Sequence, residues 1–126
     1  MPISNAAKNE AGLLIAAIPG LEANPTFVVE DVNELAQVWE TQEEFLAAIN
    51  STKRAIEQLI DGSVDAAELT YSLEGWQAYH FQHKRGQGLS ADMRIVFRME
   101  GGRLRMLAFG HRSLPNSVYY TAAGRL

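Results

Sequence analysis

The chain has 126 residues, no cysteine and a formal net charge of −4. This length suits one domain with a single core, and the absence of cysteine excludes disulfides, thiolate metal sites and a cysteine nucleophile. No stretch approaches the ~18 apolar residues of a membrane span, and the first residues lack the positive charge of a signal peptide, so we expect a cytoplasmic protein without a membrane partner.

The first 25 residues are predicted to form a leader that precedes a domain at 26–126. Within it, the composition of Ala6 to Ile18 favours a helix, which Pro19-Gly20 ends. Asn24-Pro25 is typical of a turn. The β-branched and aromatic run Thr26 to Val29 then predicts the first strand.

Two helices are predicted next. Asp31 can cap a short helix that runs to about Glu40, with Leu35, Val38 and Trp39 towards the core. Thr41 opens a longer helix, because Thr41-Gln42-Glu43-Glu44 matches the capping box. Apolar residues recur along it at helical spacing: Phe45, Ile49, Ile56, Leu59 and Ile60. Gly62 is expected to end this helix.

After Gly62 the hydrophobic period changes towards two, which predicts strands. The expected strands are Leu69 to Leu73, Gln77 to Lys84, Met93 to Met99 and Leu104 to Phe109. Glu100-Gly101-Gly102 is a tight hairpin signal between the last two. The chain is therefore predicted to be an α+β protein of order β-α-α-β-β-β, in which an antiparallel sheet packs on two helices.

Alternation sorts the strand residues onto two faces of this sheet. The apolar set is Met93, Ile95, Phe97, Met99, Leu104, Met106 and Ala108, and Phe109 is expected on the opposite face. The other face is expected to gather polar and basic groups: His80, Gln82, Lys84, Arg94, Arg98 and Arg105. Gly110-His111-Arg112 and Tyr119-Tyr120 follow the last strand.

The charge is divided between the two halves of the chain. Residues 1–75 hold three Lys or Arg and thirteen Asp or Glu, whereas residues 76–126 hold eight Lys or Arg and two acids. Seven of those eight are Arg, which favours bidentate phosphate contacts. Arg and Lys can hold a scissile phosphate, and His can take a 2′-hydroxyl proton. The basic face therefore suits phosphodiester chemistry, and no cofactor or metal site is predicted.

Residues 92–112, followed by Val118-Tyr119, resemble the C-terminal half of the RelE/ParE family of bacterial toxins. The family pattern is a strand opened by Arg, a tight turn, an apolar strand ending in Gly-His-Arg or Gly-Lys-Arg, and a nearby Val-Tyr. The resemblance covers residues 26–120 in element order. RelE-type members cleave mRNA in the ribosomal A site with basic residues and a Tyr, and a cognate antitoxin neutralises them.

The resemblance implies roles for several residues. Arg94 and Arg112 would hold the scissile phosphate and stabilise the transition state. Lys84, or His80 or His83 nearby, would be the base, and Tyr119 or His111 would be the acid or stack on a base. Arg85, Arg98 and Arg105 would add RNA contacts together with His80 and His83.

Two other functions remain open at this point. ParE-like members share the fold but inhibit DNA gyrase without nuclease activity, so the chain could be a binding module that acts through an antitoxin or gyrase. A small-molecule enzyme that uses His80, His83 and His111 is a third possibility, although no cofactor motif marks it.

Overall fold

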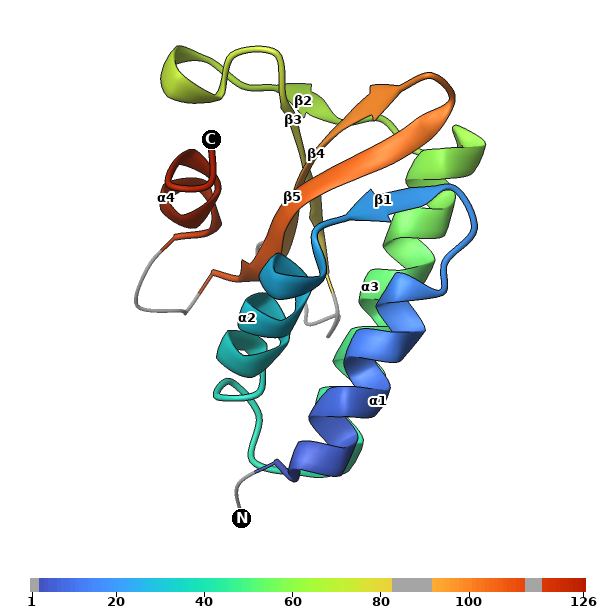
Figure 1. Cartoon of the computed structure of the whole chain (residues 1–126), viewed down its shortest axis with the longest axis vertical. Coiled ribbons are helices and arrows are strands. Elements are labelled where there is room, and N and C mark those ends of the chain that lie inside the picture. Colours follow the sequence, from blue (N-terminus) through green and yellow to red (C-terminus); the bar gives the residue numbers. More distant parts are fainter. Residues whose placement is uncertain (1–2, 83–91, 113–116) are drawn as a thin grey trace.

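The computed structural model describes residues 3–82, 92–112 and 117–126. These residues form four α-helices, a short 3₁₀ helix and a five-stranded mixed sheet (Figure 1). The α-helices are α1 (Asn5–Ala16), α2 (Pro25–Leu35), α3 (Gln42–Asp61) and α4 (Val118–Ala123). The strands are β1 (Leu21–Ala23), β2 (Ala67–Glu68), β3 (Gln77–Phe81), β4 (Met93–Glu100) and β5 (Arg103–His111). The predicted α+β class is confirmed.

The segment predicted as the first strand is helical. Asn24 is the N-cap of α2: its side chain accepts hydrogen bonds from the backbone N–H groups of Thr26 and Phe27, and Pro25 occupies the first turn. Proline suits this position because its missing N–H would have no helical partner there. The prediction of a strand at Thr26 to Val29 was therefore wrong, because the cap outweighed the β-branched composition. The helix predicted from Asp31 to about Glu40 is present only in part: α2 ends at Leu35, and Asp31 lies within it instead of capping it.

The long helix α3 follows the prediction at both ends. The Thr41 side chain accepts from the backbone N–H of Glu44 at 3.1 Å, as an N-cap residue does. At the other end Gly62 adopts a left-handed conformation, with φ of 80°. Its N–H donates to the carbonyl of Gln58, which satisfies one of the free carbonyls of the last turn.

Two glycines allow a matched test of backbone conformation. A methyl group at Gly12, in the middle of α1, or at Gly62 would meet no atom within 4 Å. Gly62→Ala should lower the free energy of unfolding by about 1 kcal/mol because of its positive φ. Gly12→Ala should instead raise the free energy of unfolding by about 0.5 to 1 kcal/mol. Urea denaturation measures the free energy of unfolding of both variants. Changes of the same sign would contradict the different backbone conformations assigned to Gly12 and Gly62.

The sheet has the strand order β1-β5-β4-β3-β2. β1 pairs with β5 in parallel, and the other three pairings are antiparallel. The prediction of a wholly antiparallel sheet was wrong because the true first strand precedes α2 and runs alongside β5. Residues 71–73, predicted as part of a strand, form the 3₁₀ helix, and the nearby strand is β2. β3 ends at Phe81, so the strand predicted from Gln77 to Lys84 is too long at Gln82, and residues 83 and 84 lie outside the described residues.

A β-bulge changes the predicted faces of β5. Val96 lies opposite Ala108, and Phe97 lies opposite Met106, so Leu107 is an extra residue in β5. Beyond the bulge the alternation is inverted. Ala108 therefore packs on the face opposite the long helix, and Phe109 packs towards α1 to α3, the reverse of the prediction.

The sheet is covered on both faces. The larger core lies between the sheet and α1, α2 and α3, and it includes Ala7, Ala11 and Ile15 of α1. The segment before residue 25 therefore contributes a helix to the main core and a strand to the sheet edge (Figure 1). On the opposite face α4 and the 3₁₀ helix cover the sheet, with Val118 and Ala122 packed against the strands.

Within 3–82, 92–112 and 117–126, no helix combines the length and apolar character that crossing a bilayer requires.

Candidate functional site

Three sequence-predicted residues meet at the end of the sheet where β4 begins. His80 of β3 lies directly opposite Arg94 of β4, and Arg94 lies opposite Gly110 of β5. Side chains of directly opposed residues share a face of the sheet. Because Gly110 has no side chain, no side chain of β5 lies directly beside Arg94.

Tyr119 reaches this position from α4. Its hydroxyl forms a hydrogen bond with Nε2 of His80. The guanidinium carbon of Arg94 lies 5.8 Å from the centroid of the Tyr119 ring, within the range of a cation–π contact. The neighbouring Val118 and Ala122 are buried against the sheet, and Ser117 caps α4 through the N–H of Tyr120. Packing and capping therefore hold Tyr119 over the strands. We refer to His80, Arg94 and Tyr119 as the HRY cluster.

The surroundings keep two members of the HRY cluster uncharged. Partial burial, and then the positive charge of Arg94, lower the pKa of His80 below its ordinary value of 6.5. Partial burial raises the pKa of Tyr119 above 10.0, although Arg94 opposes this. At neutral pH the cluster therefore holds an uncharged imidazole, a protonated phenol and one guanidinium.

Arg94 has unused capacity to bind an anion. Its Nε is buried and has no hydrogen-bond partner among the described residues. Within the same part of the chain no carboxylate forms an ion pair with it. A guanidinium has five N–H donors and always carries its charge, so this one can still bind a carboxylate or a phosphate.

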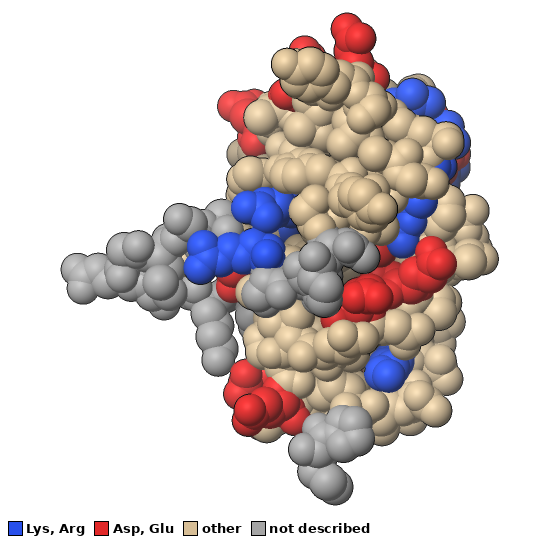
Figure 2. Space-filling view, turned by 90° about the vertical axis from the view of Figure 1, so that its left-hand side faces the viewer, with Lys and Arg blue, Asp and Glu red and all other residues tan. Residues whose placement is uncertain are grey.

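The other strand arginines are paired with acids. Arg98 and Arg105 lie directly opposite each other, and Glu100 bridges them through an ion pair with Arg98 and a 3.5 Å contact to Arg105. Arg103 pairs with Glu22 of β1 at 3.5 Å. In Figure 2, which shows the face covered by α4, Lys and Arg form separate groups with Asp and Glu beside them. Among the described residues, the basic groups predicted on this face are therefore interspersed with carboxylates.

His111 lies away from the HRY cluster. It is opposite Met93, whose side chain belongs to the core on the helix side of the sheet. Its ring meets Trp39 edge-on at 5.5 Å, and its Nε2 is 3.8 Å from a carboxylate oxygen of Asp92. The structure therefore places His111 on the opposite face from Arg94 and Tyr119.

Of the remaining predicted site residues, one comes just after the last strand in the chain and the others lie outside the described residues. Arg112 is exposed just beyond β5, and its N–H donates to the carbonyl of Asp92 at 2.9 Å. His83, Lys84 and Arg85 are outside the described residues, so their predicted roles are not tested by the structure. The described residues contain no group of three or more His, Asp or Glu side chains arranged to hold a metal ion.

A buried ion pair that we did not predict anchors the C-terminal segment. Arg125 donates to both carboxylate oxygens of Asp31, at 2.8 and 2.9 Å, and each side chain is only 7% exposed. Burial raises the pKa of Asp31, and the hydrogen bonds and charge of Arg125 offset part of that rise. In the sequence, Asp31 shares the helical spacing of Val28, Val32 and Leu35, so it was detectable only once residues 25–35 were recognised as a helix.

The pair also completes the edge of β5. β1 pairs with β5 only as far as Met106. Beyond that point the carbonyl of Leu107 accepts from Arg125 at 2.8 Å, and the N–H of Phe109 donates to Asp31 at 3.1 Å. Two side chains thus satisfy backbone groups that a longer β1 would otherwise have paired.

Comparison with known proteins assigns no family to the chain: no protein-family model, curated protein or solved structure matches it.

Proposed function

We propose that this protein is a RelE-like endoribonuclease that cuts mRNA on the ribosome, with the HRY cluster as its active site. The observation that carries the proposal is the cluster itself, in which a guanidinium with spare donors lies beside an uncharged imidazole and a protonated phenol. These are the three kinds of group that RNA cleavage by its own 2′-hydroxyl needs. The resemblance of residues 92–112 and Val118-Tyr119 to RelE toxins agrees with it.

In the proposed reaction Nε2–H of His80 donates to the hydroxyl oxygen of Tyr119, so Nδ1 accepts the proton of the 2′-hydroxyl and the 2′-oxygen forms a bond to the adjacent phosphorus. The bond from phosphorus to the 5′-oxygen of the next nucleotide breaks, and that oxygen takes the phenolic proton of Tyr119. The products are a 2′,3′-cyclic phosphate and a 5′-hydroxyl. Nε2 of the resulting imidazolium then gives its proton to the phenolate along their hydrogen bond, which restores a neutral imidazole and a protonated phenol. Arg94 stabilises the additional negative charge on the phosphate oxygens.

A binding module on the same fold is the second candidate. It is favoured by the carboxylate partners of Arg98, Arg103 and Arg105 and by the net charge of −4, both of which weaken attraction to nucleic acid phosphates. Such a module would act through a protein, either an antitoxin or gyrase, and would not cut RNA.

The experiment that separates the two functions is controlled expression in growing bacteria with mRNA cut sites mapped on translating ribosomes. Wild type should arrest growth and cut mRNA. Arg94→Ala should cut at least about 100-fold more slowly, and Arg94→Lys should retain part of the activity because it keeps the charge. Arg54→Ala removes an equal charge from an exposed position on α3 and should behave as wild type.

The controls make a negative result informative. Circular dichroism should show that each variant remains folded. If the folded wild type leaves mRNA intact, the nuclease proposal is wrong and the binding module is favoured. Equal cutting by wild type and Arg94→Ala would show that the HRY cluster is not the active site.

A further inference from the structure

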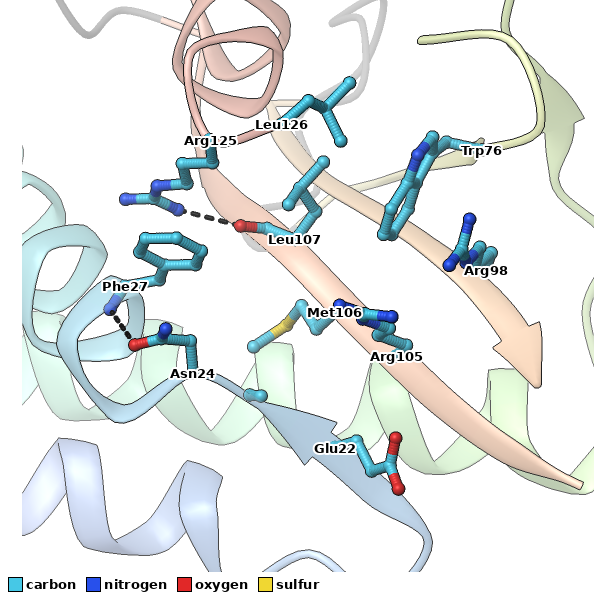
Figure 3. Close-up of a pocket in the computed structure, with 11 residues that line it drawn as sticks. Glu22, Asn24, Phe27, Trp76, Arg98, Arg105, Met106, Leu107, Arg125 and Leu126 are labelled. Atoms are coloured by element: carbon cyan, nitrogen blue, oxygen red, sulfur yellow. Dashed lines mark hydrogen bonds between the residues drawn. The ribbon is translucent and has the colours of Figure 1, made fainter. Parts of the chain in front are cut away.

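A second site on the same face of the sheet is separate from the HRY cluster. A cleft of about 600 Å³ opens where β1 ends, and it is bordered by the first turn of α2, strands β4 and β5 and the C-terminal residues (Figure 3). This volume lies within the range of small-molecule sites. Val96, which lies between Arg94 and Arg98 on β4, packs against α4. The helix therefore covers the strand between the two sites.

One part of the cleft is apolar. Figure 3 shows Phe27 and Trp76 on opposite sides of the cleft, with Met106 and Leu107 of β5 between them. Leu107 packs with the cluster on the α4 side of the sheet and Met106 with the main core, and both border the cleft beside the β-bulge where β1 ends. Trp76, Met106 and Leu107 are largely buried and form an apolar floor, and Phe27 is partly exposed beside it, which suits contact with one flat, apolar ring.

The other part carries two guanidinium groups. Arg98 and Arg105 both line the cleft, and they share the single carboxylate of Glu100. Like charges placed directly opposite each other are destabilising unless an anion lies between them. Since Glu100 carries one charge, the two guanidinium groups retain an excess of one positive charge.

Several donors of these two arginines are not used by Glu100. Nη2 of Arg98 and Nη1 of Arg105 are the atoms that contact Glu100, whereas each guanidinium has five N–H donors. The Nε of Arg98 is buried and has no partner among the described residues. The guanidinium carbon of Arg98 also lies 4.5 Å from the centroid of the Trp76 ring. This contact holds the N–H donors of Arg98 next to the apolar part of the cleft.

The other charged groups of the cleft are already paired. Arg125 is held by Asp31 and Glu30, and Glu22 is held by Arg103. A ligand therefore meets unsatisfied positive charge mainly at Arg98 and Arg105, next to the Trp76 ring.

We propose that this cleft binds a nucleotide, with its base between Phe27 and Trp76 and its phosphate on Arg98 and Arg105. A base offers a flat ring for the aromatic side chains, and a phosphate offers the planar set of acceptors that two guanidinium groups bind well. The same chemistry is presented by a free nucleoside monophosphate and by one nucleotide of a single-stranded RNA. The proposal does not depend on RNA cleavage, because binding is measured without it.

The test is a titration of the purified protein with AMP, followed by tryptophan fluorescence. The chain has two tryptophans, Trp39 and Trp76. Wild type and Trp39→Phe should show a saturable change with a dissociation constant of about 1 mM or lower, and Trp76→Phe should lose the change. A fluorescence signal that persists in Trp76→Phe, or no saturable change in wild type, would overturn the proposal.

Matched variants and ligands test the two halves of the site. Arg105→Ala should weaken AMP binding about tenfold, whereas Arg54→Ala, which removes an equal charge from an exposed position on α3 outside the cleft, should change it less than about twofold. Adenosine lacks the phosphate and ribose 5-phosphate lacks the base, so each should bind about tenfold more weakly than AMP. If either binds as tightly as AMP, the corresponding half of the proposal is wrong.

A short single-stranded RNA identifies the source of the nucleotide. Tighter binding of the RNA than of AMP, lost in Arg105→Ala, would indicate a subsite for a polynucleotide. Equal or weaker binding of the RNA would indicate a site for the free nucleotide.

Discussion

Replacing Arg125 with alanine is expected to lower the free energy of unfolding by about 3 to 5 kcal/mol. The change removes two hydrogen bonds to Asp31 and one to the carbonyl of Leu107. It also leaves a carboxylate buried without its counter-charge, and that cost is larger than the loss of the bonds themselves. Urea denaturation followed by circular dichroism measures the effect.

A double-mutant cycle shows whether the unpaired charge is the cause. Asp31→Asn keeps an acceptor for the N–H of Phe109 but removes the charge. The double variant Asp31→Asn with Arg125→Ala should therefore be more stable than Arg125→Ala alone. Arg54→Ala, which removes an exposed charge, should change the free energy of unfolding by less than about 0.5 kcal/mol. Strictly additive losses in the cycle would contradict the proposed coupling.

The ion pair links the stability of the fold to the HRY cluster. Arg125 lies two residues beyond the last residue of α4, and Tyr119 belongs to that helix. The guanidinium of Arg125 also lies 4.5 Å from the centroid of the Phe27 ring, so it joins the end of α4 to the start of α2. Because Arg125 holds the C-terminal end of α4, we expect Arg125→Ala to slow any reaction that needs Tyr119, even in the molecules that stay folded.

Local signals in the sequence were sufficient to predict α3 and the residues at which it begins and ends. The capping box at Thr41, the apolar spacing and Gly62 act within a few residues of one another, and all three agree. The same reasoning failed for α2, where the run Thr26 to Val29 has the composition of a strand. There a cap of two residues, Asn24-Pro25, decided the structure.

Features that depend on distant parts of the chain could not be predicted. The β-bulge at Leu107 is a property of the pairing between β4 and β5, and it reversed the expected faces of Ala108 and Phe109. The partner of Asp31 is 94 residues away. For the site, alternation correctly placed His80 and Arg94 on one face, but the position of Tyr119 over them depends on how α4 packs.

The proposed base makes a second prediction of large effect: His80→Gln should slow RNA cleavage by about 100- to 10,000-fold. Glutamine keeps a polar group near Tyr119 but cannot accept the 2′-hydroxyl proton at neutral pH. The rate of cleavage of mRNA in purified ribosome complexes measures this. His111→Gln is the matched control, because His111 lies on the opposite face of the sheet.

The pH dependence of the same reaction identifies which histidine acts. A base must be uncharged to work, so the rate should rise with pH through the pKa of His80 and then level off. Because burial and Arg94 lower that pKa, the midpoint of the rise should lie below 6.5. The fall in rate caused by ionisation of Tyr119 should lie above pH 10.0, since burial raises its pKa. A rise that survives in His80→Gln but disappears in His111→Gln would assign the base to His111 and would show that the HRY cluster does not supply it.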